Sequence, residues 1–404
     1  MSEPLVVIGN GMATMHFVDE LTRRALGRFA VAVVGEEPRL AYNRVLLSAV
    51  LAQEVSRSDI ELRPARWWRD RGVTLLYGRT AVGIDPTIRR VRLADKATLP
   101  YGKLVLAVGS RPVRPSVPGM DLPGVVTFRD FGDVAAIQAA AVRRPNAVVI
   151  GGGLLGLEAA YGLAKAGSRV TVVHLMDRLM ERQLDVRAAD LLKKAVEQRG
   201  ISVHLNGETV GIRGNSRARA VALKDGQEIE ADLVVVAAGV RPNIDLARTA
   251  DLDIDRGILV DDHLQTSRPG IYAIGECAEH RGTCYGLVEP AYEQARALAA
   301  HIAGENAHYP GSVLATNLKV SGVNVFSTGD FLGAHGTEQL LLSDPGLGIY
   351  KKLVIAGGRL VGAVLFGDTI DGPWYHELIR SGASIAGIRD DIIFGRALAE
   401  RKAA

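Results

Sequence analysis

Cysteine is scarce in this chain of 404 residues, which holds only Cys277 and Cys284. Two thiols are too few for a disulfide scaffold or a four-cysteine metal site. They also lack the Cys-x-x-Cys spacing of a redox pair, so we expect no dithiol chemistry. His16, His204 and His301 have no cysteine or carboxylate neighbours at metal-ligand spacing, and we expect no metal site.

The chain also lacks long apolar runs. Hydrophobic residues make up 48% of it, but none of their runs reaches the ~18 residues that a membrane helix needs. The first expected strand begins at Leu5, which leaves no room for a signal peptide before it. Lysine and arginine are scattered and the net charge is only +3, so we expect no nucleic-acid partner. These features predict a cytoplasmic α/β protein without a membrane segment.

The chain does contain the same glycine-rich pattern twice. Gly9 and Gly11 follow one apolar run, and Gly151, Gly153 and Gly156 follow another. In this pattern a strand, a tight turn and the start of a helix direct backbone N–H groups at a pyrophosphate. Two copies predict two dinucleotides on one polypeptide, and electron transfer between them is the activity that this arrangement favours.

The two copies differ at positions that matter for binding. Thr14 stands where the first loop would have its third glycine, which weakens the motif locally. Glu36 follows the next strand, where an acid can accept hydrogen bonds from a ribose; the alternative is a structural turn with a solvated glutamate. The matching position of the second copy is His174, which could bond a hydroxyl, meet a phosphate when charged, or be a surface residue. The choice between NADH and NADPH is therefore left open.

The repetition extends beyond the glycines. Each loop is followed by an expected helix, at residues 15–26 and 157–166, and later by an apolar strand, at 103–108 and 232–237. Each of these strands leads into Gly-x-Arg-Pro, which begins at Gly109 and Gly239. This order predicts a duplicated nucleotide-binding module.

The tail has a different pattern. Apolar positions alternate in residues 351–355 and 360–365, and residues 356–359 are typical of a hairpin turn. We expect a small C-terminal α+β domain with a role at an interface.

With Gly275 and Glu276 added, these motifs occur in the order found in the FAD-dependent pyridine-nucleotide oxidoreductases, and nearly the whole chain resembles that family. The resemblance implies an α/β fold with two Rossmann-like domains, the second inserted in the first. The implied boundaries are 1–112 and 240–308 for the FAD-binding domain, 113–239 for the NAD(P)H-binding domain, and 309–404 for a C-terminal interface domain, which leaves a homodimer open.

The resemblance also implies which residues bind the cofactors. The implied FAD contacts are Gly9, Gly11, Ala13, Glu36, Arg44, Gly109, Arg129, Gly275, Glu276 and Glu289. The implied NAD(P)H contacts are Gly151, Gly153, Leu155, Gly156, Glu158, His174 and Gly239, with Glu158 beside the nicotinamide carboxamide. The flavin carries the chemistry, so no catalytic side chain is expected.

The chain differs from some branches of this family, which limits the branches that it resembles. No cysteine precedes Cys277, unlike in dithiol reductases and peroxidatic NADH oxidases. Residues 35–39, 275–278, 285–288 and 316–323 resemble the flavin module of NAD(P)H-dependent nitrite reductases and of assimilatory nitrate reductase electron-transfer subunits. The implied function is electron transfer from NAD(P)H through FAD to a separate redox protein, a nitrate or nitrite reductase component.

Two alternatives stay open. One is a rubredoxin- or ferredoxin-type reductase, and the other is a flavin-binding redox sensor or assembly factor. The larger nitrite-reducing proteins continue into cysteine-rich iron–sulfur and sirohaem regions, which these 404 residues do not contain. We therefore expect no nitrite reduction by this chain alone.

Overall fold

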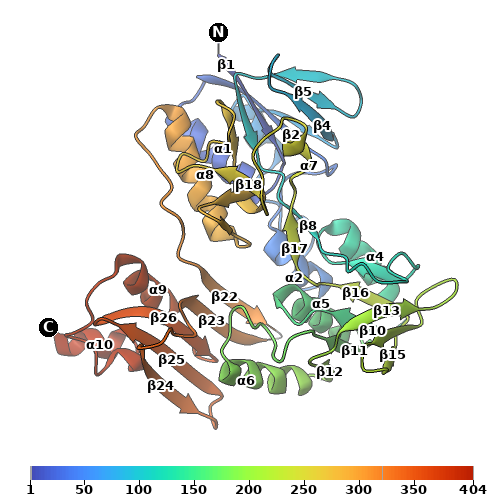
Figure 1. The fold of residues 1–404 in the computed structure, drawn as a ribbon, viewed down its shortest axis with the longest axis vertical. Helices are drawn as coiled ribbons and strands as arrows, with labels where there is room; N and C mark the ends of the chain where they lie inside the picture. The colour runs from blue at the N-terminus through green and yellow to red at the C-terminus, as the bar shows by residue number, and fades with distance from the viewer. Residues whose placement is uncertain (1, 321, 404) are drawn as a thin grey trace. The chain divides into compact units, whose positions relative to one another are not determined.

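The computed structural model describes residues 2–320 and 322–403, which fall into two compact units (Figure 1). Unit 1 comprises Met1–Val50, Val55–Arg111 and Val240–Ser312. Unit 2 comprises Leu51–Glu54, Pro112–Gly239 and Val313–Ala404, so the inserted segment and the tail are grouped together. The division into three domains at the boundaries given above stays a prediction.

Unit 1 is built on a parallel sheet of five strands in the order β19-β7-β1-β2-β3. Their bounds are β1 Glu3–Ile8, β2 Phe29–Gly35, β3 Thr74–Tyr77, β7 Lys103–Leu106 and β19 Ile271–Ala273. Helices α1 (Met12–Arg24) and α8 (Val288–Ala303) pack against each other in this unit. Leu5 and Val7 of the central strand are fully buried, as expected for a sheet covered on both faces.

The remaining elements of unit 1 surround this sheet. One antiparallel sheet contains β4 (Ala81–Asp85), β5 (Arg90–Leu93) and β6 (Thr98–Pro100), and a second small sheet contains β18 (Ile258–Val260), β20 (Ala278–His280) and β21 (Thr283–Cys284). The short helices are Arg44–Leu46, α2 (Leu47–Leu51), α3 (Ala65–Asp70), α7 (Asp245–Arg248) and Gly275–Cys277. Strands β8 (Ser110–Pro112) and β17 (Val240–Pro242) pair where the chain leaves this unit and returns to it.

Unit 2 contains a second five-stranded parallel sheet, in the order β12-β11-β10-β16-β9. Its strands are β9 Val125–Thr127, β10 Asn146–Ile150, β11 Arg169–Val173, β12 Ile201–His204 and β16 Leu233–Val236. The helices are α4 Phe131–Ala141, α5 Leu154–Lys165 and α6 Val186–Glu197, and β13 (Thr209–Arg213), β14 (Ala220–Leu223) and β15 (Glu228–Glu230) form an antiparallel sheet. Strand β10 lies between β11 and β16 as β1 lies between β2 and β7, so the predicted duplication is confirmed.

The tail forms an antiparallel sheet in the order β22-β23-β26-β25-β24. Its strands are β22 Ala315–Val320, β23 Val323–Gly329, β24 Glu338–Asp344, β25 Ile349–Ala356 and β26 Arg359–Phe366, followed by α9 (Gly372–Ser381), Ile392–Phe394 and α10 (Arg396–Ala403). Gly357 and Gly358 link β25 to β26 with positive φ angles of 54° and 69°, which glycine adopts without strain. The predicted hairpin and the α+β character of the tail are confirmed.

A buried polar contact joins the tail to the inserted domain within unit 2. Asp185 accepts a hydrogen bond from the Ala188 N–H and so caps the N-terminus of α6. The same carboxylate accepts a 2.6 Å hydrogen bond from the Tyr350 hydroxyl and lies 3.7 Å from Nζ of Lys352. Both partners lie on β25, so one side chain of the inserted domain fixes the position of the tail sheet.

Several predicted boundaries shift in a consistent way. The helices expected at 15–26 and 157–166 begin three residues earlier, at Met12 and Leu154, because each helix starts directly after the glycine that serves as its N-cap. The strands expected at 103–108 and 232–237 end at Leu106 and Val236, before the residues that turn toward the glycine loops. Errors of this size are ordinary at element ends.

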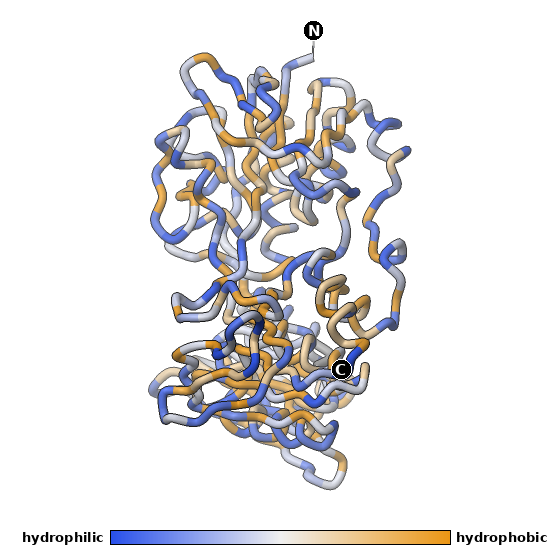
Figure 2. Tube along the Cα trace, turned by 90° about the vertical axis from the view of Figure 1, so that its right-hand side faces the viewer, coloured by the Kyte–Doolittle hydropathy of each residue, from blue (hydrophilic) through white to orange (hydrophobic). Residues whose placement is uncertain are grey.

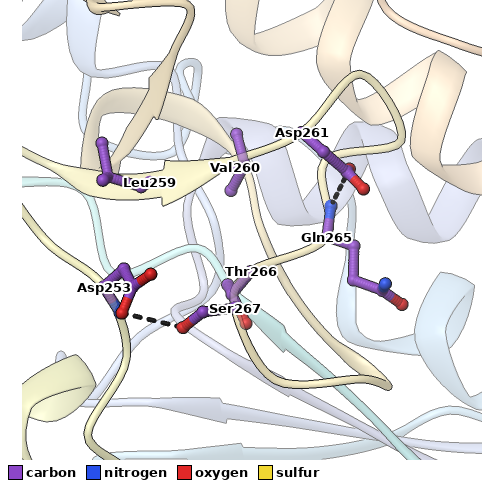
Figure 3. Close-up of a pocket in the computed structure, with 7 residues that line it drawn as sticks. All are labelled: Asp253, Leu259, Val260, Asp261, Gln265, Thr266 and Ser267. Carbon is purple, nitrogen blue, oxygen red and sulfur yellow. Dashed lines mark hydrogen bonds between the residues drawn. The ribbon is translucent and has the colours of Figure 1, made fainter.

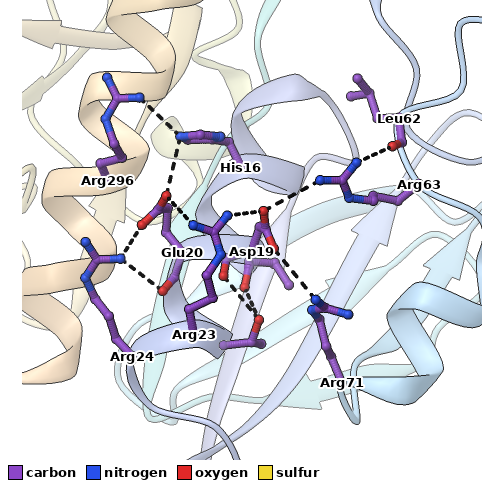
Figure 4. A network of polar contacts seen from close by, with 11 residues as sticks. His16, Asp19, Glu20, Arg23, Arg24, Leu62, Arg63, Arg71 and Arg296 are labelled. Carbon is purple, nitrogen blue, oxygen red and sulfur yellow. Dashed lines mark hydrogen bonds and ion pairs between the residues drawn. The ribbon is translucent and has the colours of Figure 1, made fainter.

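A polar network holds α1 in place within unit 1 (Figure 4). Asp19 and Glu20 are buried on this helix and pair with the arginines of its last turn. Two further arginines reach Asp19, Arg63 at 3.8 Å and Arg71 at 3.9 Å, while Arg296 of α8 lies 3.5 Å from the ring of His16. Because buried carboxylates are stable only when paired, this network fixes the helix whose N-terminus faces the first glycine loop.

Apolar and polar residues alternate in short stretches along the trace (Figure 2). Within the described ranges, no helix is long and apolar enough to cross a membrane.

Candidate functional site

The first glycine loop leaves an open space at the N-terminus of α1. Gly9 has φ +110°, and a Cβ there would lie 2.1 Å from the Ala107 carbonyl oxygen, so only glycine fits. Gly11 is the N-cap of α1, with no side-chain cap and nothing within 4 Å of where its Cβ would be. The free helix N–H groups and the empty space are what a pyrophosphate needs, so these residues fit the predicted dinucleotide.

Thr14 stabilises this turn although it replaces the third glycine of the motif. Its side chain is fully buried, and its hydroxyl donates a 2.8 Å hydrogen bond to the carbonyl oxygen of Gly9. The threonine therefore closes the turn from the helix side, where the second loop has a glycine.

The next strand end holds the side chains expected near a ribose. Glu36 is exposed directly after β2. The amide of Asn10 donates to the Arg39 carbonyl at 3.1 Å and so ties the glycine loop to the segment after β2. Gly35 permits this tie, because a Cβ there would lie 2.6 Å from that of Asn10. The arrangement leaves the Glu36 carboxylate available to a ligand.

Arg44 is held by its neighbours. Its guanidinium pairs with Glu37 and lies 5.0 Å from the centre of the Tyr42 ring. The Tyr42 hydroxyl donates to the same carboxylate at 2.9 Å. Arg44 is thus fixed in the segment that follows β2, at the same end of the sheet as the glycine loop.

A second group of predicted residues gathers at the carboxyl ends of β7 and β19. The Ser110 hydroxyl donates to Glu276 at 2.8 Å, next to Gly109 with its φ of +63°. Gly275 has φ +78°, and a Cβ there would lie 3.3 Å from that of Ala13 in the first turn of α1. Its N–H donates to the buried amide oxygen of Gln294 at 2.7 Å. Because β1, β7 and β19 are parallel, these residues share one edge of the sheet with the first loop.

The predicted flavin roles of two further residues, Glu289 and Arg129, are not tested. Glu289, in the first turn of α8, is exposed and accepts a 3.1 Å hydrogen bond from Arg296. Arg129 belongs to unit 2, where its N–H donates to Asp133 at 2.7 Å. Their roles toward FAD stay predictions.

The second glycine loop repeats the first with a tighter fit. Gly151 has φ +122°, and a Cβ there would lie 2.2 Å from the Ala237 carbonyl oxygen. Gly153 is the uncapped N-cap of α5 and faces open space. At Gly156 a Cβ would lie only 1.9 Å from the carbonyl oxygen of Gly151. This loop therefore also offers a helix N-terminus shaped for a pyrophosphate.

Other predicted NAD(P)H contacts lie around this loop. Leu155 and Glu158 are half-buried in the first turns of α5. Gly239 follows β16 with φ +99°, and no atom lies within 4 Å of its Cβ position. The geometry is compatible with the predicted roles of these residues, which stay predictions.

His174 is buried, so its interpretation as a surface residue is wrong. Its Nδ1 accepts a 3.0 Å hydrogen bond from the Gly152 N–H, and its Nε2 lies 3.1 Å from a carboxylate oxygen of Glu181. A ring that accepts through Nδ1 carries its proton on Nε2 when neutral and donates it to Glu181. His174 thus holds the second loop, and both ring nitrogens have partners within the protein.

Neither cysteine is poised for chemistry at neutral pH. Cys277 is completely buried, and this burial raises the pKa of its thiol to about 11. Burial, followed by the charge of Glu279, raises the pKa of Cys284 to about 11 as well. Over residues 2–320 and 322–403, no three His, Cys, Asp or Glu side chains are grouped so that they could hold a metal ion.

A hollow of about 320 Å³ lies elsewhere in unit 1, beside β18, and both polar and apolar residues line it (Figure 3). Its polar groups bond to one another: the Asp253 N–H donates to the Ser267 hydroxyl and the Gln265 N–H to the Asp261 carboxylate, both at 2.9 Å. None of its lining residues was predicted as a site residue, and we assign it no ligand.

Five side chains at these sites were not predicted. They are Asn10, Thr14, Ser110, Glu181 and Gln294. Ser110 has a sequence signal, as the second residue of the first Gly-x-Arg-Pro. The others act through partners that only the fold brings near them.

Two parallel sheets, each with an open glycine loop after a central strand, define a protein that holds two dinucleotides. Residues 3–300 match the family of pyridine nucleotide-disulphide oxidoreductases, and the chain belongs to this family. Residues 315–383 match the C-terminal domain of rubredoxin NAD+ reductase. Membership confirms the predicted cofactors, FAD and NAD(P)H, and the predicted oxidoreductase activity.

Individual relatives show which members of this family the chain is similar to. The chain is 45% identical to a nitrite reductase [NAD(P)H] of Bacillus subtilis over 95% of its own length and 48% of that protein. It is 44% identical to an assimilatory nitrate reductase electron transfer subunit of the same organism, over 91% of its length and 48% of that protein. The chain thus spans about half the length of these two relatives. Among solved structures, a ferredoxin reductase for the CYP199A2 system from Rhodopseudomonas palustris superimposes with a TM-score of 0.88 at 26% identity, covering 100% of this chain and 98% of that one.

Proposed function

We propose that this chain carries electrons from NAD(P)H through FAD to a separate redox protein that is a nitrate or nitrite reductase component. The observation that carries the proposal is the pair of open glycine loops, at Gly11 and Gly153, in a chain similar to a nitrite reductase and to a nitrate reductase electron transfer subunit. Each loop has its own sheet and its own helix N-terminus, so two dinucleotides can be bound at once.

The chain's own residues bind and orient the cofactors. The N–H groups after Gly11 and Gly153 neutralise pyrophosphate charge, and Glu36 receives the ribose hydroxyls at the first site. FAD, when bound, would supply the redox chemistry between the nicotinamide and the acceptor. Ser110 and Gln294 fix the turns at Glu276 and Gly275 that would border the flavin.

The chain does not contain the ligands for the final reduction. Iron–sulfur clusters are held by several thiolates, whereas the two cysteines present have raised pKa values and are buried or half-buried. The centre that reduces nitrite or nitrate therefore belongs to residues outside this sequence, and electrons leave this chain before that step.

A rubredoxin- or ferredoxin-type acceptor is the second candidate. The match of residues 315–383 to the rubredoxin NAD+ reductase C-terminal domain favours it. In this alternative the cofactor sites are unchanged and only the acceptor differs. A homodimer and a cytoplasmic location remain further parts of the proposal.

The acceptor is tested by measuring NAD(P)H oxidation by the purified holoprotein with ferricyanide, with a nitrite reductase component, with a rubredoxin and with a ferredoxin. We expect fast ferricyanide reduction and no ammonium from nitrite until the reductase component is added. Slow turnover with every acceptor would instead indicate a redox sensor. Ammonium formation by this chain alone, at the ferricyanide rate, would refute the electron-transfer role.

A further inference from the structure

The ribose position of the second dinucleotide site is built in an unusual way. A dinucleotide fold commonly places an acid at the end of the second strand, where it receives the ribose 2′-hydroxyl of NADH and repels the 2′-phosphate of NADPH. In this chain the strand is β11, and the residue after it is His174. The histidine cannot serve as that acid, since it is not acidic and both its ring nitrogens are engaged.

An acid does stand next to the histidine. Glu181 accepts the Nε2 proton of His174 at 3.1 Å, and its side chain is 23% exposed. The histidine is anchored on the other side by the N–H of Gly152, inside the glycine loop itself. A relay of two hydrogen bonds therefore holds a partly exposed carboxylate beside the strand end where a ribose would lie.

Two arginines lie near this place in the chain, and each has a carboxylate beside it. Arg178 pairs with Asp177 at 2.9 Å and is 22% exposed. Arg182 is 86% exposed, with its Nε 4.0 Å from Glu181. The two residues directly after His174 are exposed and apolar, Leu175 at 59% and Met176 at 43%. Carboxylates thus accompany both arginines, and exposed apolar side chains follow the strand end.

We propose that Glu181 makes this site selective for NADH over NADPH, with His174 as its positioning residue. The carboxylate takes the place of the strand-end acid, receiving the ribose hydroxyl and repelling a 2′-phosphate. This inference rests on the proposed binding of the nicotinamide cofactor in unit 2, but it does not depend on the electron acceptor.

The test titrates the holoprotein with NAD+ and NADP+ by calorimetry, without any reductant or acceptor. We expect NAD+ to bind at least about tenfold more tightly, the scale of one close charge repulsion at a partly exposed site. Glu181→Gln should reduce this preference by about tenfold, mainly by strengthening NADP+ binding. Glu181→Arg should reverse the preference. Glu197→Gln, which removes a surface carboxylate of α6 paired with Lys193, is the matched control and should leave the preference unchanged.

The positioning role has its own readout. His174→Ala should lower the NAD+ to NADP+ preference although Glu181 is present, whereas a general loosening of the loop would weaken both nucleotides equally. A wild-type preference for NADP+, or an unchanged preference in Glu181→Gln, would overturn the proposal. So would selective loss of NADP+ binding in Arg182→Gln, because the arginine would then read the phosphate. Failure of every protein acceptor would leave these titrations unaffected, so the two proposals fail separately.

Discussion

The two glycine loops solve the same steric problem in different ways. In both, the first glycine has a positive φ and lies against a strand-end carbonyl, and the N-cap glycine faces open space. They differ where the helix passes the turn. Thr14 bonds the Gly9 carbonyl at 2.8 Å, whereas a Cβ at Gly156 would lie 1.9 Å from the matching oxygen of Gly151. Helix α1 is therefore separated from its glycine turn by the Thr14 hydroxyl, whereas α5 packs directly against its own turn.

The comparison separates the glycines that the fold requires from those that it does not. Gly9, Gly151 and Gly156 are required by the fold itself, since a Cβ would overlap backbone. Gly11 and Gly153 have φ angles of −110° and −80°, which any residue adopts, and their surroundings are empty. At these two positions the protein itself gives no steric reason for glycine, which agrees with the predicted contacts to the two pyrophosphates.

The largest effect should come from filling the first open space. Gly11→Val should lower FAD affinity by up to about 100-fold, because overpacking a filled contact costs about 1–3 kcal/mol and each 1.4 kcal/mol is about tenfold. The apoprotein should still fold, since nothing in the protein meets the new side chain. Flavin absorbance after purification and after reconstitution measures the loss, and circular dichroism checks the fold. A yellow Gly11→Val protein would contradict the assignment of this loop to FAD.

Filling the second open space should separate the two cofactors. Gly153→Val should leave FAD bound but abolish flavin bleaching by NAD(P)H, because the substitution blocks only the second pyrophosphate position. Anaerobic absorbance spectra with NAD(P)H and then with dithionite measure both properties in one sample. Loss of flavin with intact nicotinamide binding would mean that the two loops are assigned in reverse.

Exchanging the third residues of the loops should give unequal costs. Gly156→Thr should destabilise the protein by about 3 kcal/mol, the upper range for overpacking, because its Cβ meets a backbone oxygen. Thr14→Gly should cost about 2 kcal/mol, from one lost hydrogen bond and a glycine in a helix. Denaturant unfolding of the apoproteins measures both. Equal costs would show that the two turns have the same spacing after all.

The smallest effect should come from the cysteines. The variant with both Cys277→Ser and Cys284→Ser should keep NAD(P)H-dependent ferricyanide reduction within about twofold, since the flavin and not a thiol carries the electrons. The raised pKa values predict slow iodoacetamide labelling of the native wild type at pH 7, with the rate increasing as the pH approaches 11.

The same pKa values predict the direction of a stability change. A thiol whose pKa is higher in the folded state than its ordinary 9 contributes stability below pH 9 that is lost as the pH rises toward 11. Wild type should therefore lose more stability over this range than the double variant. In the activity assay, loss of ferricyanide reduction by the double variant, with flavin bleaching by NAD(P)H preserved, would indicate that the thiols relay electrons.

The sequence predicted the repeated architecture because glycine and apolar strand patterns act locally. Gly9, Gly151 and the strands before them are recognisable within ten residues, and the hairpin after Ile355 was found in the same way. The role of His174 was missed because its partner, Gly152, lies 22 positions earlier and is a backbone N–H. The role of Thr14 was missed because a side chain that replaces glycine is read as a loss until its hydroxyl is seen to bond the turn.

The predicted helix boundaries were wrong for a related reason. Helix propensity alone predicts that α1 begins at Met15. In the structure it begins at Met12, directly after Gly11, because the turn geometry makes Gly11 the N-cap. The N-terminal helical residues are set by the cap and not by apolar spacing.

The contact between Asp185 and β25 has a consequence for how such proteins can be recombined. Exchanging residues 313–404 for the tail of another reductase, in order to redirect electrons, would remove Tyr350 and Lys352 from a buried carboxylate that also starts α6. A donor module that lacks a hydroxyl and an ammonium at those two strand positions would leave the anion facing apolar surface. The part that can be exchanged is therefore the tail together with Asp185, because a graft must keep both partners of this contact.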